Sequence, residues 1–530
     1  MDSEYVVSKK SLKALRVDVP DGRSFIPDVE LDNLMTLRSI LATIKERCEN
    51  ADRGYELEKL AQEIFAHLKK IFAILILMGE ENLIRDFVHE HYWDSSLLHS
   101  SETPTAVKDP KRFQKKKWKF LAPIIEAGDF HREFSAKTVI PILSESIISS
   151  GAGGIVYKVE LHRMQQKLVS GTPGGPLFLA RKELGSYVRK DEVESERQAL
   201  EMIRLVKHPN IIELLATYKI LDRHNMLFPL AQMDLKAFLE TKPAAPFDDN
   251  RYLFQSMRNL ASALETIHNP SICQLGYHRD IKPGNILLID NVFKITDFGL
   301  ARFKPHTNGD TTKSQYRGGD NIYGAPDRIP TDGTEDCPKV GRKYDIWSLG
   351  CVFLDLASFI ARGPEGFKQF RVKRFTKVGC VSDEMFYAEN QTPEGYQPDV
   401  KKEVLDWIVE LKHESEGELS LILDIIRRML KGKPEERPTA EEVRQEFEII
   451  LSQGIGIFSI AFLEFYNADI PIQKAREERA GPSHQDVQAL LAVVRGGHEW
   501  VASCLLEGGA DPKYRSGVGW TSDKQSIQGR

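Results

Sequence analysis

Residues 277–288 of the chain read YHRDIKPGNILL, and residues 297–299, nine positions further on, read DFG. Transfer of a phosphoryl group to a hydroxyl needs a base for the hydroxyl proton, a positive group beside the phosphate and oxygen ligands for magnesium, all held in line. In the first stretch Asp280 fits the base and Lys282 fits the positive group. Asn285 and Asp297 supply the kinds of oxygen that Mg²⁺ prefers. The pattern therefore predicts a magnesium-dependent phosphoryl-transfer site.

These two stretches also admit a plainer interpretation, a polar loop between two buried strands. A lone Asp-Phe-Gly would deserve that interpretation, but the joint pattern at this spacing argues against it. Together the stretches resemble the catalytic loop and the metal-binding turn of protein kinases. The resemblance implies ATP and Mg²⁺ as cofactors and a protein hydroxyl as the acceptor. Lys282 follows Asp280 by two residues, which is the arrangement of serine/threonine kinases.

A glycine-rich segment lies upstream, where residues 149–156 read SSGAGGIV. It resembles the kinase glycine-rich loop, in which glycines let backbone amides approach phosphate closely. Alignment on Val156 places Gly151 and Gly154 at the second and third glycines of that loop, and Gly153 lies between them. Ser149 replaces the first glycine. A tight hairpin turn has a similar sequence, so the segment is weak evidence when taken alone.

Residues 179–182 read LARK and resemble the kinase strand motif whose lysine reaches the α- and β-phosphates. Lys182 is therefore the expected phosphate-binding lysine, and Ala180 is expected beside the nucleotide. The alternative is a surface lysine at a strand edge. Lys182 needs an acidic partner from the next helix. Glu196 has apolar residues at the same-face offsets and is our choice, with Glu194 and Glu201 as alternatives.

Residues 225–230 predict a strand that leads into a hinge. Comparison of the segment around Asp234 with kinases places Phe228 at the back of an adenine pocket. Pro229 to Ala231 would supply hinge carbonyl and amide groups, because Pro229 lacks an N–H but keeps its carbonyl acceptor. Asp234 is a candidate for binding the ribose.

Three acidic residues are expected to support the site. The segment DIWSLG resembles the kinase helix that anchors the catalytic loop, which implies that Asp345 bonds the backbone of that loop. Residues 325–327 read APD where kinases usually have Ala-Pro-Glu, and the resemblance implies a buried ion pair between Asp327 and Arg437. Asp320 stands where serine/threonine kinases place a threonine that contacts the base, so a second carboxylate is expected near Asp280.

The segment after the metal-binding turn contains candidate phosphorylation sites. Arg279, next to the base, suggests that a phosphate on this segment could order it through charge-assisted hydrogen bonds. Thr311, Thr312 and Ser314 are the candidates. An ordinary flexible polar loop is the alternative.

Two further segments have only structural roles in this interpretation. Residues 164–176 are polar and glycine-rich, which predicts an inserted surface loop. Residues 113–123 carry Trp118, Phe120 and Leu121 among lysines, and these side chains are expected to pack against a neighbouring lobe.

The chain is too long for one core, so several domains are expected. We predict an α+β protein with the bilobal protein-kinase fold, a small β-rich N-lobe and a larger α-helical C-lobe. The expected parts are an N-terminal helical extension (1–135), a kinase domain (136–455, with lobes 136–233 and 234–455), a linker (456–482) and a partial ankyrin repeat region (483–530). The extension resembles that of certain fungal protein kinases. The last region resembles an ankyrin repeat that has too few neighbours to form an autonomous binding surface.

Composition limits the partners. The net charge of −5 gives no general attraction to nucleic acid or to an anionic membrane. The six cysteines lack Cys-x-x-Cys spacing, which argues against a zinc site and fits a reducing compartment. The apolar run at residues 71–78 is too short to span a bilayer. We expect a cytoplasmic protein, or a nuclear one if the basic residues 108–119 act as an import signal.

The expected partners are a protein substrate, ATP and a protein bound through the ankyrin-like region. Two rival functions remain open. The first is a pseudokinase or scaffold that binds ATP without efficient transfer, for which Ser149 and Asp320 are the support. The second is an interaction protein that acts mainly through residues 483–530.

Overall fold

The computed structural model describes residues 5–48, 54–99, 103–151, 154–168, 175–185, 190–241, 244–270, 274–305, 314–315, 319–328, 339–378, 381–392 and 395–453. The chain divides into two compact units. The first comprises Met1–Val193 and Glu213–Leu230, and the second comprises Glu194–Ile212 and Ala231–Arg530. The predicted linker and ankyrin-like region (456–530) lie outside the described residues.

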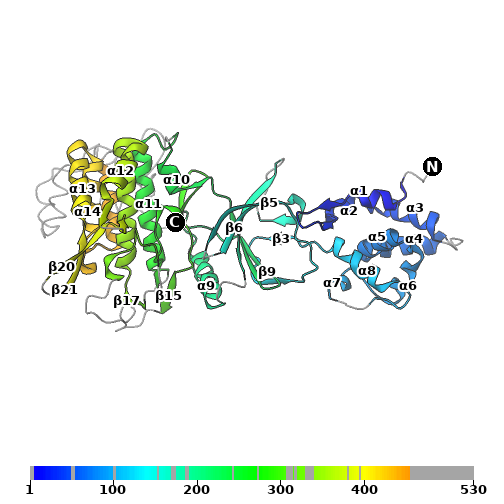
Figure 1. Cartoon of the computed structure of the whole chain (residues 1–530). Coiled ribbons are helices and arrows are strands. Elements are labelled where there is room, and N and C mark those ends of the chain that lie inside the picture. The colour runs from blue at the N-terminus through cyan, green and yellow to red at the C-terminus, as the bar shows by residue number, and fades with distance from the viewer. Residues whose placement is uncertain are drawn as a thin grey trace, which may run out of the picture. The chain divides into compact units, whose positions relative to one another are not determined.

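The first unit begins with a helical bundle, as predicted. Its helices are α1 (Lys9–Ala14), α2 (Asp28–Leu34), α3 (Leu37–Arg47), α4 (Gly54–His67), α5 (Lys69–Met78), α6 (Ile84–His89), α7 (Ser96–His99) and α8 (Pro110–Lys117). Helix α5 is apolar on all sides from Ile71 onward, so it forms the centre of the bundle (Figure 1). It ends at Gly79, whose φ of 78° is the left-handed conformation that favours glycine at a helix C-terminus.

A six-stranded sheet follows the bundle, with the order β4-β9-β10-β8-β6-β5. The strands are β4 (Arg132–Phe134), β5 (Ile142–Gly151), β6 (Gly154–Leu161), β8 (Leu177–Leu184), β9 (Ala216–Ile220) and β10 (Arg223–Pro229). All pairs are antiparallel except β4 with β9. Val159, Leu179 and Leu227 belong to one apolar cluster, so alternate side chains of these strands build its core.

The sequence predicted a surface loop over residues 164–176, of which residues 169–174 lie outside the described residues. Residues Arg163–Gln165 form a 3₁₀ turn, and β7 (Gln166–Lys167) pairs in parallel with β3 (Ile125–Glu126). Gln165 is fully buried, its amide donates to the carbonyl of Ala122 at 3.0 Å, and its oxygen accepts from the Asp28 N–H at 3.2 Å. The prediction is wrong for residues 164–168, because a polar residue such as Gln165 can be buried when both ends of its amide find partners.

Gln165 is one of several contacts that join the bundle to the sheet within this unit. Arg23, beside the short strands β1 (Val17–Asp18) and β2 (Ser24–Phe25), donates to the carbonyl of Thr138 at 2.9 Å. Phe120 and Leu121 were expected to pack on a neighbouring lobe, but they lie in the core of the bundle itself. Directional hydrogen bonds from Gln165 and Arg23 therefore connect the helical extension to the sheet.

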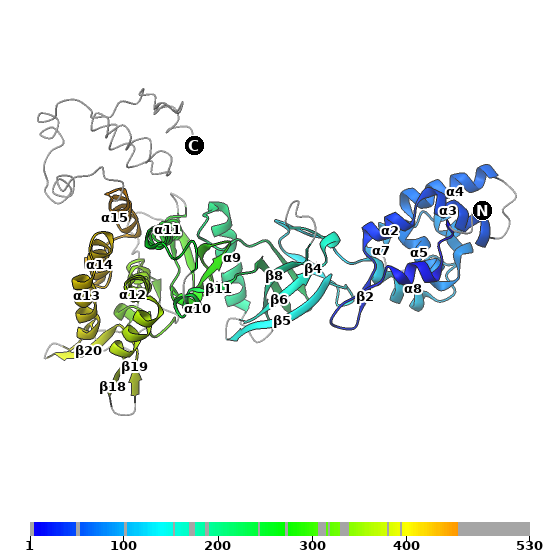
Figure 2. The ribbon, with the colours of Figure 1, turned by 90° about the horizontal axis from the view of Figure 1, so that it is seen from above.

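The second unit is mainly helical. It contains most of α9 (Lys190–Val206), then α10 (Leu235–Leu239), α11 (Asn250–His268), α12 (Lys343–Arg374), α13 (Lys402–Glu414), α14 (Glu418–Met429) and α15 (Ala440–Gln453). Helix α11 buries Met257, Leu260 and Leu264 at the predicted helical spacing. Helices α12, α13 and α14 lie side by side (Figure 2).

Helix α12 is the core of this unit. Its first half, from Tyr344 to Phe359, is buried, and the helix kinks at Gly363, where φ is 66°. Among the described helices it is long and apolar enough to cross a membrane, but 89% of its most apolar part is buried inside the protein. Such burial is typical of the core helix of a folded domain.

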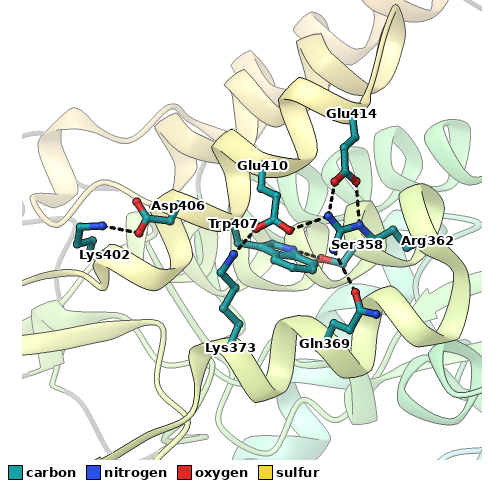
Figure 3. Close-up of polar contacts among 9 residues, drawn as sticks. All are labelled: Ser358, Arg362, Gln369, Lys373, Lys402, Asp406, Trp407, Glu410 and Glu414. Atoms are coloured by element: carbon teal, nitrogen blue, oxygen red, sulfur yellow. Dashed lines mark hydrogen bonds and ion pairs between the residues drawn. The ribbon is translucent and has the colours of Figure 1, made fainter.

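Polar side chains connect α12 to α13, some at the surface and some within the core (Figure 3). Arg362 donates to Glu414 at 2.5 and 2.8 Å and to Glu410 at 2.8 Å. The Trp407 indole N–H donates to the Ser358 hydroxyl at 2.8 Å. These contacts hold the two helices in one register.

Short antiparallel pairs complete the second unit. The three-stranded sheet β11-β13-β14 contains Met233–Asp234, Ile286–Ile289 and Val292–Ile295. Strand β12 (Gln274–Tyr277) pairs with β15 (Arg302–Pro305), and β16 (Ser314–Gln315) with β17 (Lys339–Val340). Two hairpins follow α12, β18–β19 (Thr376–Val378 and Val381–Asp383) and β20–β21 (Tyr387–Thr392 and Gly395–Val400).

Candidate active site

The predicted base, Asp280, lies in the loop between β12 and the 3₁₀ turn Pro283–Asn285. The amide nitrogen of Asn285 donates to the carboxylate of Asp280 at 2.7 Å and to its main-chain carbonyl at 2.8 Å. The Lys282 ammonium lies 2.8 Å from the same carboxylate oxygen, Oδ2. The loop thus brings three of the predicted site residues together, because the tight turn reverses the chain between them.

Asp345 of α12 anchors this loop through hydrogen bonds to its backbone. Its two carboxylate oxygens accept from the backbone N–H groups of His278 at 2.8 Å and Arg279 at 2.7 Å. His268 of α11 contacts one of these oxygens at 3.0 Å. Full burial acts to raise the pKa of Asp345, but the hydrogen bonds and charges of His268 and His278 outweigh it and keep the pKa below its ordinary value. The predicted role of Asp345 is confirmed.

Arg279 and Asp297 have the left-handed backbone conformation, with φ of 70° and 63°. A residue with a side chain adopts it at a cost of about 1–3 kcal/mol, so the surrounding bonds must compensate. Asp345 provides that bond at Arg279. At Asp297 the preceding residue, Thr296, donates its N–H to the carbonyl of Asn285 at 2.9 Å. The metal-binding turn is therefore tied directly to the catalytic loop.

The donors at Asn285 and Asp297 fit a magnesium ion. Both N–H groups of the Asn285 amide go to Asp280, so its carbonyl oxygen is the atom left to act as a ligand. Asp297 is half-buried and places a carboxylate at the turn. An amide oxygen and a carboxylate, completed by substrate phosphates and water, are a typical magnesium environment.

Neighbouring carboxylates keep the Lys282 side chain protonated. Partial burial acts to lower its pKa, but the hydrogen bond and charge of Asp280, together with the charges of Asp320 and Asp297, raise the pKa of Lys282 above its ordinary value. The ammonium is therefore positive at neutral pH. Its N–H groups can stabilise negative charge on a phosphate that lies next to Asp280.

The second carboxylate expected near the base is present. The backbone N–H of Asp320 donates to Oδ1 of Asp280 at 3.1 Å, and the Asp320 carboxylate lies 3.7 Å from Lys282. Its other oxygen accepts from the N–H groups of Ile322 at 2.8 Å and Tyr323 at 3.2 Å. Asp320 thus replaces a hydroxyl with a charge that also caps the following turn.

The predicted ion pair between Asp327 and Arg437 is confirmed, at 2.8 Å. The Arg437 side chain is fully buried and also donates to the carbonyls of Lys431, Gly432 and Lys343. The shorter aspartate reaches this arginine because Asp327 lies in a 3₁₀ turn, Pro326–Arg328. The pair anchors the segment that follows the metal-binding turn.

The sheet of the first unit carries the predicted nucleotide residues. Val156, Lys182 and Met226 are in register across β6, β8 and β10, so they share a face, and Ala180 lies two residues along β8 on that same face. A Cβ atom on Gly154 would lie 2.6 Å from the Glu183 carbonyl, so only glycine fits there. Gly151 ends β5, and Gly153 lies outside the described residues.

The remaining predicted residues are placed on separate elements. Phe228 is buried and Pro229 ends β10, whereas Ala231 and Asp234 belong to the second unit. Asp234 caps α10 through one carboxylate oxygen. Thr311 and Thr312 lie outside the described residues, and Ser314 is in strand β16.

Glu196 of α9 is buried, with 5% of its surface exposed. A Cβ atom on Gly299 would lie 3.7 Å from its carboxylate, so Glu196 is next to the Asp-Phe-Gly turn. Lys182 belongs to the other unit, and its pairing with Glu196 stays a prediction.

Sequence reasoning missed one buried polar cluster. The Tyr323 hydroxyl donates to Asp355 of α12 at 2.7 Å, and Arg374 lies 3.5 Å from the same carboxylate. Both charged residues are almost fully buried. The available signal was an acidic residue within the apolar run of α12, because a buried carboxylate requires partners.

Comparison with known proteins agrees with this geometry. The sequence profile described as "Protein kinase domain" matches residues 145–447, which is more than half of the chain. The chain belongs to the protein kinase family, and its two-part β-rich and helical fold is the one predicted.

The chain is similar to serine/threonine kinases. It is 28% identical to probable serine/threonine-protein kinase mps1 of Dictyostelium discoideum, over 41% of this chain and 21% of that protein. It is 25% identical to mitogen-activated protein kinase 9 of Oryza sativa subsp. japonica, over 59% of this chain and 44% of that protein. It is 28% identical to mitogen-activated protein kinase 13 of Oryza sativa subsp. indica, over 46% of this chain and 47% of that protein. The chain thus spans less than half the length of these relatives.

Proposed function

We propose that the chain is an active serine/threonine protein kinase that transfers the γ-phosphoryl group of ATP to a protein hydroxyl. The observation that carries this proposal is the arrangement at Asp280. Its carboxylate is held by Asn285 and Lys282 at 2.7 and 2.8 Å, in a loop anchored on a buried aspartate. Such fixed positioning and charge neutralisation supply most of the catalysis in phosphoryl transfer.

Each residue has a stated role in the proposed reaction. Asp280 orients the acceptor hydroxyl and takes its proton. Lys282 stays protonated and stabilises negative charge on the transferred group. Asn285 and Asp297 would hold magnesium, which when bound neutralises the phosphates. Lys182 binds the α- and β-phosphates, and Glu196 orients that lysine.

A pseudokinase that binds ATP without transfer is the second candidate, and Asp320 is the observation that favours it. A carboxylate there competes for Lys282. The distances favour activity, because Lys282 is 2.8 Å from Asp280 and 3.7 Å from Asp320. The ammonium therefore stays with the base.

Asp280→Asn tests the proposal. With purified chain, labelled ATP and magnesium, we expect phosphorylation of the chain or of a Ser/Thr peptide library to fall at least about a hundredfold in this variant, since removing a general base typically costs that much. Asp290→Asn is the matched control, because Asp290 is exposed in a turn with φ of 50°, which asparagine tolerates. ATP binding without turnover in the unmodified chain would support the pseudokinase instead.

The location and further partners belong to the proposal as well. A cytoplasmic location, or a nuclear one, is consistent with the reducing environment that the cysteine pattern favours. A protein partner bound through residues 483–530 would add recruitment to catalysis. Fluorescent fusion of the full chain and of a variant lacking these residues tests both points.

A further inference from the structure

The helical bundle carries six basic side chains that the proposed function does not use. They are Lys9 and Lys13 of α1, Arg112, Lys115 and Lys116 of α8, and Lys119 in the 3₁₀ turn Trp118–Phe120. We call this set the basic surface. Its two segments are about one hundred residues apart in the sequence, so their meeting is a property of the fold.

The packing of α5 brings the two segments together. Both α1 and α8 contact this central helix. The Lys9 ammonium lies at the C-terminal end of α5, where a Cβ on Gly79 would be 2.8 Å away. The charges face one another closely enough to interact. Lys116 is repelled by Arg112, Lys119, Lys13 and Lys9. Lys119 is repelled by Arg16, Lys115 and Lys13 and attracted by Asp18.

The surroundings neutralise the basic surface only in part, through the attraction of Lys119 by Asp18, a carboxylate that itself pairs with Arg16 at 2.5 Å. Among the residues that the structure describes, none of its six cations forms an ion pair with a carboxylate. Other cations of the same bundle do, as Lys69 with Asp32 at 2.7 Å and Lys70 with Asp28 at 2.8 Å. Four of the six are exposed, and Lys116 and Lys119 are half-buried.

The repulsion has a measurable consequence. Partial burial, and then the neighbouring cations, lower the pKa of Lys116 and of Lys119 below the ordinary value. Like charges gathered on one exposed surface create a positive potential that attracts anionic groups from outside the chain. A ligand that brings negative charge would relieve the repulsion.

We propose that the basic surface binds an acidic, Asp/Glu-rich peptide segment of a partner protein. Five of the six cations are lysines, which are point charges on flexible stems, whereas bidentate recognition of a single phosphate group is typical of arginine. Charges spread over two helices suit several separate carboxylates along an extended peptide. The chain as a whole has a net charge of −5, which disfavours long polyanions and charged membranes more than a short peptide.

A binding experiment on the full chain tests this proposal. The probe is a fluorescent decapeptide of alternating Glu and Ser, and its neutral counterpart alternates Gln and Ser. We expect the acidic peptide to bind, with weaker binding at higher salt. In Lys116→Gln/Lys119→Gln we expect a loss of about fivefold or more in affinity. The matched control is Lys45→Gln/Lys59→Gln, which removes two exposed lysines of the same bundle outside the basic surface.

Two further measurements distinguish an effect on peptide binding from an effect on stability or on catalysis. The double variant at 116 and 119 is expected to melt at the same temperature as the unmodified chain or higher, because it removes repulsion. Binding to Asp280→Asn is expected to be unchanged, so a failure of the proposed kinase activity would leave this result intact. Peptide affinity unaltered in a folded Lys116→Gln/Lys119→Gln chain would overturn the proposal. So would equal binding of the neutral peptide, or tighter binding of phosphatidylserine vesicles or of a single-stranded oligonucleotide of equal charge.

Discussion

The backbone N–H of Asp320 donates to Oδ1 of Asp280 at 3.1 Å. The other oxygen of Asp280, Oδ2, accepts hydrogen bonds from the Lys282 ammonium and the Asn285 amide. Both oxygens of the proposed base are thus held by groups of known position. One of these groups, the N–H of Asp320, belongs to the segment after the metal-binding turn. The position of the Asp280 carboxylate therefore depends on whether that segment is ordered.

Asp320 is expected to act on the base through the turn that it caps. Asp320→Ala removes the acceptor for the N–H groups of Ile322 and Tyr323. We expect kcat to fall about tenfold as the turn loosens, at a stability cost of about 1 kcal/mol. Asp320→Asn keeps an acceptor and should retain most of kcat, and Asp320→Thr should as well. Steady-state kinetics on a peptide substrate measure this. Equal kcat in the alanine and asparagine variants would contradict the capping role.

The buried pair of Arg437 and Asp327 is expected to stabilise the second unit strongly. Arg437→Ala leaves the partly buried Asp327 carboxylate without its partner and frees three carbonyls, so we expect a loss of about 3 kcal/mol in the free energy of unfolding. Urea denaturation measures it. Arg428→Ala is the control, because Arg428 is exposed and pairs only at the surface with Glu446, and should cost less than about 1 kcal/mol. A similar loss of unfolding free energy in the two variants would show that the Arg437–Asp327 pair stabilises the protein no more than a surface ion pair does.

Asp94 is expected to make the bundle sensitive to pH. Its carboxylate, more than twenty residues further along the chain, accepts hydrogen bonds from the N–H groups of Lys70 and Ile71 in the first turn of α5. Burial raises its pKa from 3.8 to about 6, with a further contribution from Asp28, although those two hydrogen bonds and Lys70 act to lower it. The folded state therefore binds the proton more tightly than the unfolded state. This stabilisation is complete below about pH 4 and is lost as the pH rises through about 6.

Hydrogen exchange of the α5 amides, corrected for intrinsic rates, measures that effect. Protection should decline between pH 4 and 6 in the unmodified chain. Asp94→Asn cannot ionise, so its protection should be flat over that range. Asp32→Asn, at an exposed ion pair of the same bundle, is the control. A decline that persists in Asp94→Asn would assign the pH dependence to another group.

The contacts of Arg362 shown in Figure 3 are expected to contribute modestly. Arg362→Ala loses its bonds to Glu410 and Glu414 and its packing over Trp407, at 4.6 Å from the ring centre. We expect a cost of about 1–2 kcal/mol, part of it from the lost packing. A double-mutant cycle with Glu414→Ala should give a coupling below about 1 kcal/mol, because both groups are partly exposed. Larger coupling would indicate a site that excludes water more fully than this surface does.

Local sequence determined much of this protein. Residues 277–299 predicted the catalytic loop and the metal-binding turn, since spacing within one turn is set by the covalent chain. The periodic apolar positions of α11 and the burial of residues 71–78 also followed from sequence alone, because a helix aligns every third or fourth residue.

Only the tertiary structure decided which distant groups meet. The sequence predicts a surface loop around Gln165, but Ala122 and Asp28 supply partners that allow its burial. Asp355 and Arg374, and the basic residues of α1 and α8, come together for the same reason. Whether a polar or charged side chain is neutralised depends on atoms that are near in space and remote along the chain, and sequence spacing does not contain that information.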